Sequence, residues 1–182
     1  MARTPEFDRA EVVARARDLF WAHGYQGTSM RALADATGLK PGSLYAAFGS
    51  KEGIFREALD DYVARVKALA ERLNGPRAIL EGWFRAHVRE ASKGRRGCLL
   101  LNSVSESPQL DPESARAVRA ELTQLERFFA HCVAEADREG EQPPEVVARL
   151  LVAALAGISA MSRAGVPTRH LKDVAACALT LV

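Results

Sequence analysis

Residues 38–56 constrain the fold of this 182-residue chain more than any other segment. They read Gly-Leu-Lys-Pro-Gly-Ser-Leu-Tyr-Ala-Ala-Phe-Gly-Ser-Lys-Glu-Gly-Ile-Phe-Arg, which predicts a short helix over 41–48 and the start of a longer helix at 50. Just upstream, Thr28 is expected to cap another short helix over 28–36, which stops at Gly38. Two brief helices joined by a glycine-containing turn are the outline of a helix-turn-helix, which lays its second helix in the major groove of DNA.

The other segments also read as helices, because apolar residues recur at helical spacing and none alternates convincingly as a strand does. Asp8 with Glu11 predicts a capping box for a helix that ends at His23, and Asp111 before Pro112 predicts another helix start. The further expected ranges are 50–73, 77–92, 98–104, 111–139, 144–162 and 168–182. The predicted fold is therefore all-α.

The expected helix over 50–73 connects two parts of the chain. It begins beside the helix-turn-helix and ends well outside it, and no Gly/Ser/Pro-rich linker separates the parts. We therefore expect a small N-terminal domain over 1–50 and a larger helical domain over 51–182, mechanically coupled through this helix.

The net charge of +2 is informative once it is divided along the chain. Residues 1–56 hold eight of the 25 basic and six of the 23 acidic residues, which leaves 17 of each in the remainder. The excess positive charge thus lies where the helix-turn-helix is predicted, as a phosphate-facing surface requires.

Several features indicate a cytoplasmic protein with no membrane partner. The first residues lack the apolar core of a secretion signal, and no apolar run reaches the roughly 18–20 residues of a membrane helix. Cys98, Cys132 and Cys177 are odd in number and follow no metal-ligand spacing, which favours free thiols in a reducing compartment. We expect no cofactor and no metal.

Many residues at fixed spacing support the helix-turn-helix interpretation. They are Gly24-Tyr25-Gln26-Gly27-Thr28-Ser29-Met30-Arg31-Ala32-Leu33-Ala34, Gly38-Leu39, Gly42-Ser43-Leu44-Tyr45, Phe48 and Ser50-Lys51-Glu52. Over about residues 8–57 this set resembles the tetracycline-repressor (TetR) family of bacterial regulators, whereas the rest matches only in length and helical character. The resemblance implies a ligand-responsive transcriptional regulator, expected to be a repressor, which binds a palindromic operator as a homodimer.

The resemblance also implies which residues contact operator DNA: Thr28, Arg31, Lys40, Gly42, Ser43, Tyr45 and Lys51. Arg31 suits a guanine edge, and the N–H groups of Gly42 and Ser43 at a helix start suit a phosphate. This chain departs from the family at Lys40, where a capping Ser is common, and at Pro41, where a polar residue often reaches DNA. Because the third helix lacks Arg, Asn and Gln, base readout is expected to rest on Arg31 and DNA shape. The alternative is that these are packing or surface residues only.

In the larger domain, the resemblance places six residues on the helices that line the family's ligand cavity: Trp83, His87, Cys98, Asn102, Phe128 and Cys132. Aromatic walls with a few polar groups predict a small, largely apolar effector. Each residue is also a candidate for plain core. Cys98 follows a cationic loop at a helix start, which favours a reactive thiolate, but it equally suits an apolar core.

The segments 144–162 and 168–182 carry small and apolar residues at helical spacing. By resemblance they form the four-helix interface of a homodimer, although two apolar helices bury equally well within one chain. Two other functions stay open. One is an enzyme that uses Cys98 or a histidine, against which stands the lack of any phosphate loop, metal-ligand spacing or Ser/His/Asp arrangement. The other is an architectural DNA-binding protein without an effector.

Overall fold

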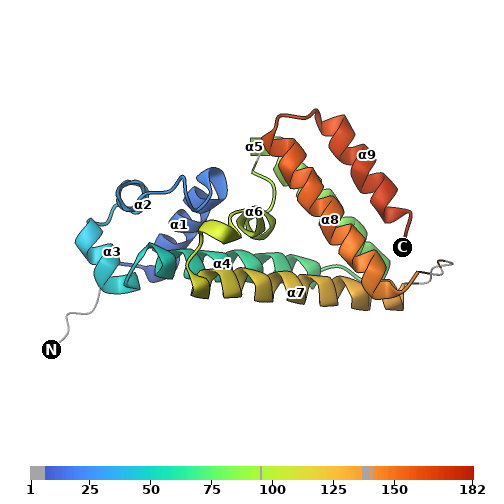
Figure 1. The fold of residues 1–182 in the computed structure, drawn as a ribbon, viewed down its shortest axis with the longest axis horizontal. Helices are drawn as coiled ribbons and strands as arrows, with labels where there is room; N and C mark the ends of the chain where they lie inside the picture. Colours follow the sequence, from blue (N-terminus) through green and yellow to red (C-terminus); the bar gives the residue numbers. More distant parts are fainter. Residues whose placement is uncertain (1–6, 95, 137–139, 141) are drawn as a thin grey trace.

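The computed structural model describes residues 7–94, 96–136, 140 and 142–182, and every regular element in that part of the chain is a helix. The all-α prediction is therefore confirmed. The elements are α1 (Arg9–His23), α2 (Met30–Thr37), α3 (Pro41–Phe48), α4 (Lys51–Ala70), α5 (Pro76–Gly94), α6 (Leu99–Ser105), the 3-10 turn η1 (Ser107–Gln109), α7 (Pro112–Glu135), α8 (Pro144–Arg163) and α9 (Thr168–Leu179). In Figure 1, α1–α3 gather at one end, α4 and α7 run side by side, and α8 and α9 lie at the other end.

Three helices begin where a short polar side chain caps them, as predicted. The carboxylate of Asp8 accepts from Ala10 N and the hydroxyl of Ser50 accepts from Gly53 N. Asp111 does the same for α7, with Pro112 in the first turn. These caps satisfy N–H groups that a helix start leaves without partners.

Two predicted caps are wrong. Ser29, not Thr28, caps α2, because its hydroxyl accepts from Ala32 N at 3.0 Å. The capping box of α1 also does not form, since the Glu11 carboxylate pairs with Arg15 one turn further along the helix.

Several helix ends differ from the predicted ones. α4 ends at Ala70 rather than at 73, because the chain turns before the Asn-Gly-Pro break. α7 ends at Glu135, where Ala136 is extended, and part of the predicted end at 139 lies outside the described residues. α9 ends at Leu179 rather than at 182.

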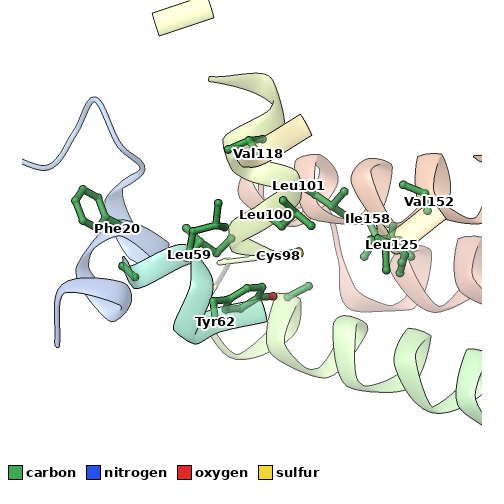
Figure 2. Close-up of a cluster of buried hydrophobic side chains, with 14 of the residues drawn as sticks. Phe20, Leu59, Tyr62, Cys98, Leu100, Leu101, Val118, Leu125, Val152 and Ile158 are labelled. Carbon is green, nitrogen blue, oxygen red and sulfur yellow. The ribbon is translucent and has the colours of Figure 1, made fainter. Parts of the chain in front are cut away.

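The buried apolar side chains form one continuous cluster through both ends of the molecule. Figure 2 shows the middle of it, where Leu59 and Tyr62 of α4 connect Phe20 of α1 to the side chains of α6 and α7. Packed cores transmit displacement because they hold few voids. The DNA-binding end is thus mechanically joined to the larger helical part.

α8 is the most apolar of the long helices. By length and composition it meets the requirement for a membrane-crossing helix, contrary to the sequence expectation that no segment does. However, 44% of that stretch is buried, against α7 and α9 among others, as in a core helix of a globular protein. Its exposed surface carries the charged residues Glu145, Arg149 and Arg163 and also an apolar stripe, described below.

Candidate functional site

The two short helices of the predicted helix-turn-helix are fixed by a small apolar core. Leu33 of α2 and Leu44 of α3 are fully buried, and Phe48 is 8% exposed. Gly38 ends α2 with a φ of 75°, which a side chain with a Cβ rarely adopts. The buried face of each helix is thus fixed, which leaves the opposite face for solvent.

That opposite face carries five of the seven predicted DNA contacts. Arg31, Lys40, Gly42, Ser43 and Tyr45 are all exposed, and the Tyr45 ring is 50% exposed. Within the described residues, the side chains of Arg31, Lys40 and Tyr45 have no hydrogen bond or ion pair. Two cations and a phenol are therefore free to meet a polyanion.

At the start of α3, one of the two N–H groups predicted to bind phosphate, those of Gly42 and Ser43, is free to donate. Ser43 N already donates to Lys40 O at 2.9 Å, so it is not available as expected. Gly42 N has no acceptor in the part of the chain that the structure describes, and no heavy atom lies near the place where a Cβ would stand. Gly42 thus presents an unused donor at the positive end of a helix dipole.

The other two predicted contacts lie away from this face. Thr28 is 1% exposed, and its hydroxyl donates to Gly24 O at 2.7 Å, so its predicted role in DNA contact is wrong. Lys51 lies with its ammonium 4.0 Å from the centroid of the Tyr25 ring, and burial lowers its pKa. Lys51 would have to leave that ring to reach a phosphate.

A backbone contact joins this unit to the loop after α6. The Glu106 carboxylate accepts from Tyr25 N at 2.8 Å, across 81 positions of sequence. Gly24 has a φ of 74°, which a residue with a Cβ rarely adopts, and a Cβ there would stand 2.3 Å from Glu106 Oε1, so glycine suits this close approach. No local pattern signals this contact, because its donor is main chain.

Two side chains make further connections between the ends of the molecule. The indole of Trp21 donates to Gly97 O at 3.0 Å, directly before α6. Arg56 of α4 reaches the start of α7, where it donates to Ser114 Oγ and pairs with Glu113. These contacts connect α6 and α7 directly to α1 and α4.

A cavity of about 750 Å³ lies beside these connections. Its walls come from α1, α4, α5, α6 and α7, and Trp21 and Cys98 form part of them. Trp83 of α5 and Phe128 of α7 both line it and pack on each other, with their ring centroids 5.7 Å apart. This volume and these aromatic walls suit a small organic molecule.

The cavity includes four of the six predicted ligand residues: Trp83, His87, Cys98 and Phe128. Asn102 and Cys132 are buried outside it, and this part of the prediction is not supported. The Asn102 amide donates to Arg96 O at 2.6 Å, so it closes a loop instead. Helical spacing indicated which residues are buried, but not which side of a buried helix faces the cavity.

Sequence analysis missed Trp21 and Tyr62, which also line the cavity. Tyr62 follows Leu59 on the apolar face of α4, and that spacing was the available signal. Trp21 belongs to α1, in the predicted DNA-binding domain, and no local pattern brings α1 to a cavity of the other domain.

Cys98 lies in an apolar setting rather than the electropositive one that the sequence suggested. Burial raises the pKa of its thiol, although the Tyr62 hydroxyl donates to the sulfur and opposes this effect. Figure 2 shows the Cys98 side chain close to that of Tyr62, which comes from α4. The thiol therefore stays protonated at neutral pH, which favours the apolar-core alternative over a reactive thiolate.

His87 is a buried titratable residue of the cavity wall. It is 7% exposed, and its Nε2 lies 3.0 Å from both Leu155 O and Ser159 Oγ. Burial lowers the pKa of His87 to about 4, and the bond to Leu155 O only partly compensates. The ring is therefore neutral at physiological pH.

Acid is expected to destabilise the fold through His87. Between pH 6.5, its ordinary pKa, and about pH 4 the unfolded chain binds a proton that the folded protein does not bind. The stabilising contribution of the neutral His87 ring is therefore complete above pH 6.5. It decreases on acidification, which lowers the free energy of unfolding by on the order of 3 kcal/mol at pH 4. Urea unfolding at several pH values measures it. His87→Gln should flatten this dependence and His131→Gln, at an exposed site, should not; equal curves would contradict the assignment.

Two family profiles match this chain. "Bacterial regulatory proteins, tetR family" matches residues 12–58, and "Tetracyclin repressor-like, C-terminal domain" matches residues 70–177. The second match alone covers more than half of the sequence. The chain belongs to the TetR family. It is a helix-turn-helix transcriptional regulator, as the resemblance implied.

Individual transcriptional regulators resemble it over most of its length. The HTH-type transcriptional repressor ComR of Escherichia coli K12 is 31% identical, over 98% of this chain and 90% of its own. The uncharacterized HTH-type regulator YezE of Bacillus subtilis 168 is 35% identical over 78% of this chain and 76% of its own. A solved cysteine mutant of the TetR-family regulator CifR, complexed with a 26-base-pair operator, is 32% identical over 98% of both chains, with a TM-score of 0.80.

Proposed function

We propose that this TetR-family regulator binds a palindromic operator as a homodimer, represses transcription and is released or retuned by a small, largely apolar effector in the cavity. The domains proposed for these tasks are 1–50 and 51–182, and the protein acts in the cytoplasm. One observation carries the proposal. An exposed, unpaired basic face of a helix-turn-helix is joined by a continuous core to a cavity of about 750 Å³.

The proposed operator contacts are those that the exposed face offers. Arg31 donates to a guanine edge, and Lys40, Ser43 and Tyr45 hold the phosphate backbone together with Gly42 N. Lys51 joins them if it leaves the Tyr25 ring. The CifR structure supports this role, since a relative of 32% identity is solved on its operator.

The proposed dimer interface is the exposed apolar stripe of α8 with the outer face of α9. Along α8, Val146 is 45% exposed and Leu150 53% exposed. The small residues Ala153, Gly157 and Ala160 continue the stripe at spacings of three and four residues. Small side chains let two helices approach closely, and a two-fold axis presents two recognition helices to a palindrome.

The proposed coupling runs from the cavity to α1. Trp21 and Cys98 line the cavity, and the Trp21 indole is hydrogen-bonded to Gly97 next to Cys98. An effector that displaces this loop shifts α1 and thereby the spacing of the two recognition helices. The free energy available equals the difference in the effector's affinity for the two states.

Removing one proposed base contact is expected to weaken operator binding by about tenfold to a hundredfold, as loss of a bidentate guanine contact does. A gel-shift titration of Arg31→Ala at stated salt, on the DNA that flanks the protein's own gene, measures this change. Arg127→Ala is the matched control, because Arg127 is an exposed arginine of α7.

The same assay bears on the alternatives. If the wild type gives no sequence-specific shift, and Arg31→Ala and Arg127→Ala bind alike, the proposed function is wrong. If the operator binds but no small apolar molecule changes its affinity, the architectural alternative is favoured.

A further inference from the structure

The cavity offers no unpaired positive charge to a ligand. Four cationic side chains line it, and each pairs with a carboxylate in the described part of the chain. They are Arg17 and Arg65 with Asp61, Lys67 with Glu121, and Arg89 with Glu90. These pairs are mostly at the partly exposed rim and each is weak, but together they leave no surplus cation for an anion. The remaining walls are largely apolar.

One polar atom inside the cavity is nevertheless without a partner. Leu155 O can only accept, so its contact of 3.0 Å with Nε2 is a hydrogen bond in the tautomer that carries the ring proton on Nε2, and Ser159 Oγ, 3.0 Å from the same nitrogen, then accepts as well. We assign this tautomer to His87. Nδ1 then carries a lone pair and has no donor among the described residues. The ring is neutral, because burial lowers its pKa to about 4.

This atom faces open space rather than protein. Among the described residues, Asp111 Oδ2 is the only side-chain N or O atom that is both inaccessible to solvent and without a hydrogen-bond partner. Nδ1 of His87 also lacks a partner, so it must be accessible to a solvent molecule. His87 itself is 7% exposed, and the space it lines is the cavity. An acceptor therefore points into an apolar enclosure, where a missing donor is most unfavourable.

We infer that the effector is an uncharged, largely apolar molecule with one hydroxyl or N–H group, which donates to Nδ1 of His87. This inference rests on the proposed effector site and adds the chemistry that the site selects. A carboxylate or phosphate would find no unpaired cation in the cavity, and its negative oxygens would be repelled by the lone pair on Nδ1 of His87. A ligand with no donor leaves Nδ1 unsatisfied.

Three probes of similar shape separate these cases: naphthol, its methyl ether and naphthoate, titrated by calorimetry at pH 7. Naphthol should bind at least about tenfold more tightly than the ether, as one buried hydrogen bond allows, and naphthoate should bind no better than the ether. Equal affinity for naphthol and the ether, tighter binding of naphthoate, or no binding of naphthol would each overturn the inference.

A His87 variant tested with two ligands, and an NMR signal of the wild type, separate the loss of this hydrogen bond from a defect in folding. His87→Phe should abolish the preference for naphthol and leave the affinity for the ether within about threefold. In the wild type, the NMR resonance of Nδ1 should move when naphthol is added and stay in place with the ether; no movement with naphthol would contradict the proposed bond.

The operator assay distinguishes this inference from the proposed function. If naphthol binds through Nδ1 but operator affinity does not change, the ligand chemistry holds and the regulatory role of the cavity is wrong. If operator release occurs with naphthoate instead, regulation holds and the ligand chemistry is wrong.

Discussion

Leu150→Glu is expected to convert the proposed homodimer to a monomer and to lower operator affinity by about a hundredfold or more. Leu150 is 53% exposed at the centre of the apolar stripe of α8, and a carboxylate there would face its copy across the two-fold axis. A monomer loses the second half-site, whose binding is otherwise intramolecular at a high effective concentration. Light scattering after gel filtration measures the mass, and a gel shift measures the affinity.

The neighbouring Leu151 shows why this substitution tests assembly rather than folding. Leu151 is fully buried in the core, whereas Leu150 is 53% exposed and is not part of the buried core. Ala120→Glu is the control, because it adds the same charge at an exposed position of α7. A Leu150→Glu protein that remains dimeric with unchanged affinity would place the interface elsewhere.

Phe55→Ala is expected to lower the free energy of unfolding by about 3–5 kcal/mol. The Phe55 ring is fully buried at the junction of α4 with the helix-turn-helix. It meets Phe20 and Tyr25 edge to face, with centroid distances of 5.3 Å and 5.1 Å. Truncation removes the buried area and both ring contacts and leaves a cavity. Denaturant unfolding measures the change.

Tyr45→Ala is the matched control for Phe55→Ala, since it also removes an aromatic ring. Tyr45 is 50% exposed, so its loss should change stability by less than about 0.5 kcal/mol while weakening operator binding. If both variants lower stability equally, the Phe55 cluster is not the anchor of the DNA-binding end.

Local structure was predictable wherever the determining residues are neighbours in sequence. Asp8, Ser50 and Asp111 cap their helices because a short polar side chain needs only the next few N–H groups. Gly38 ends α2 because glycine alone adopts its backbone conformation cheaply. The prediction that Thr28 caps α2 was wrong, because the adjacent hydroxyl of Ser29 can make the same cap and tertiary packing buries Thr28.

The cavity was only partly predictable. Trp83 and Phe128 were found because large aromatic side chains on apolar helix faces must be buried somewhere. Whether a buried side chain lines a void or fills a core depends on how whole helices pack. For this reason Phe128 lines the cavity, whereas Cys132, one turn later on α7, is buried outside it. The free Nδ1 of His87 was out of reach as well, because its partner on the other ring nitrogen lies 68 positions away.

The contact between Glu106 and Tyr25 sets a rule for exchanging DNA-binding domains between members of this family. Its donor is a main-chain N–H, so this contact does not depend on the side chain at position 25, although the Tyr25 ring packs on Phe20 and Phe55. Its requirement is the missing Cβ at Gly24, which lets the carboxylate approach. A transplanted N-terminal domain therefore keeps this connection to the recipient if it has glycine at position 24 and any residue other than proline at 25.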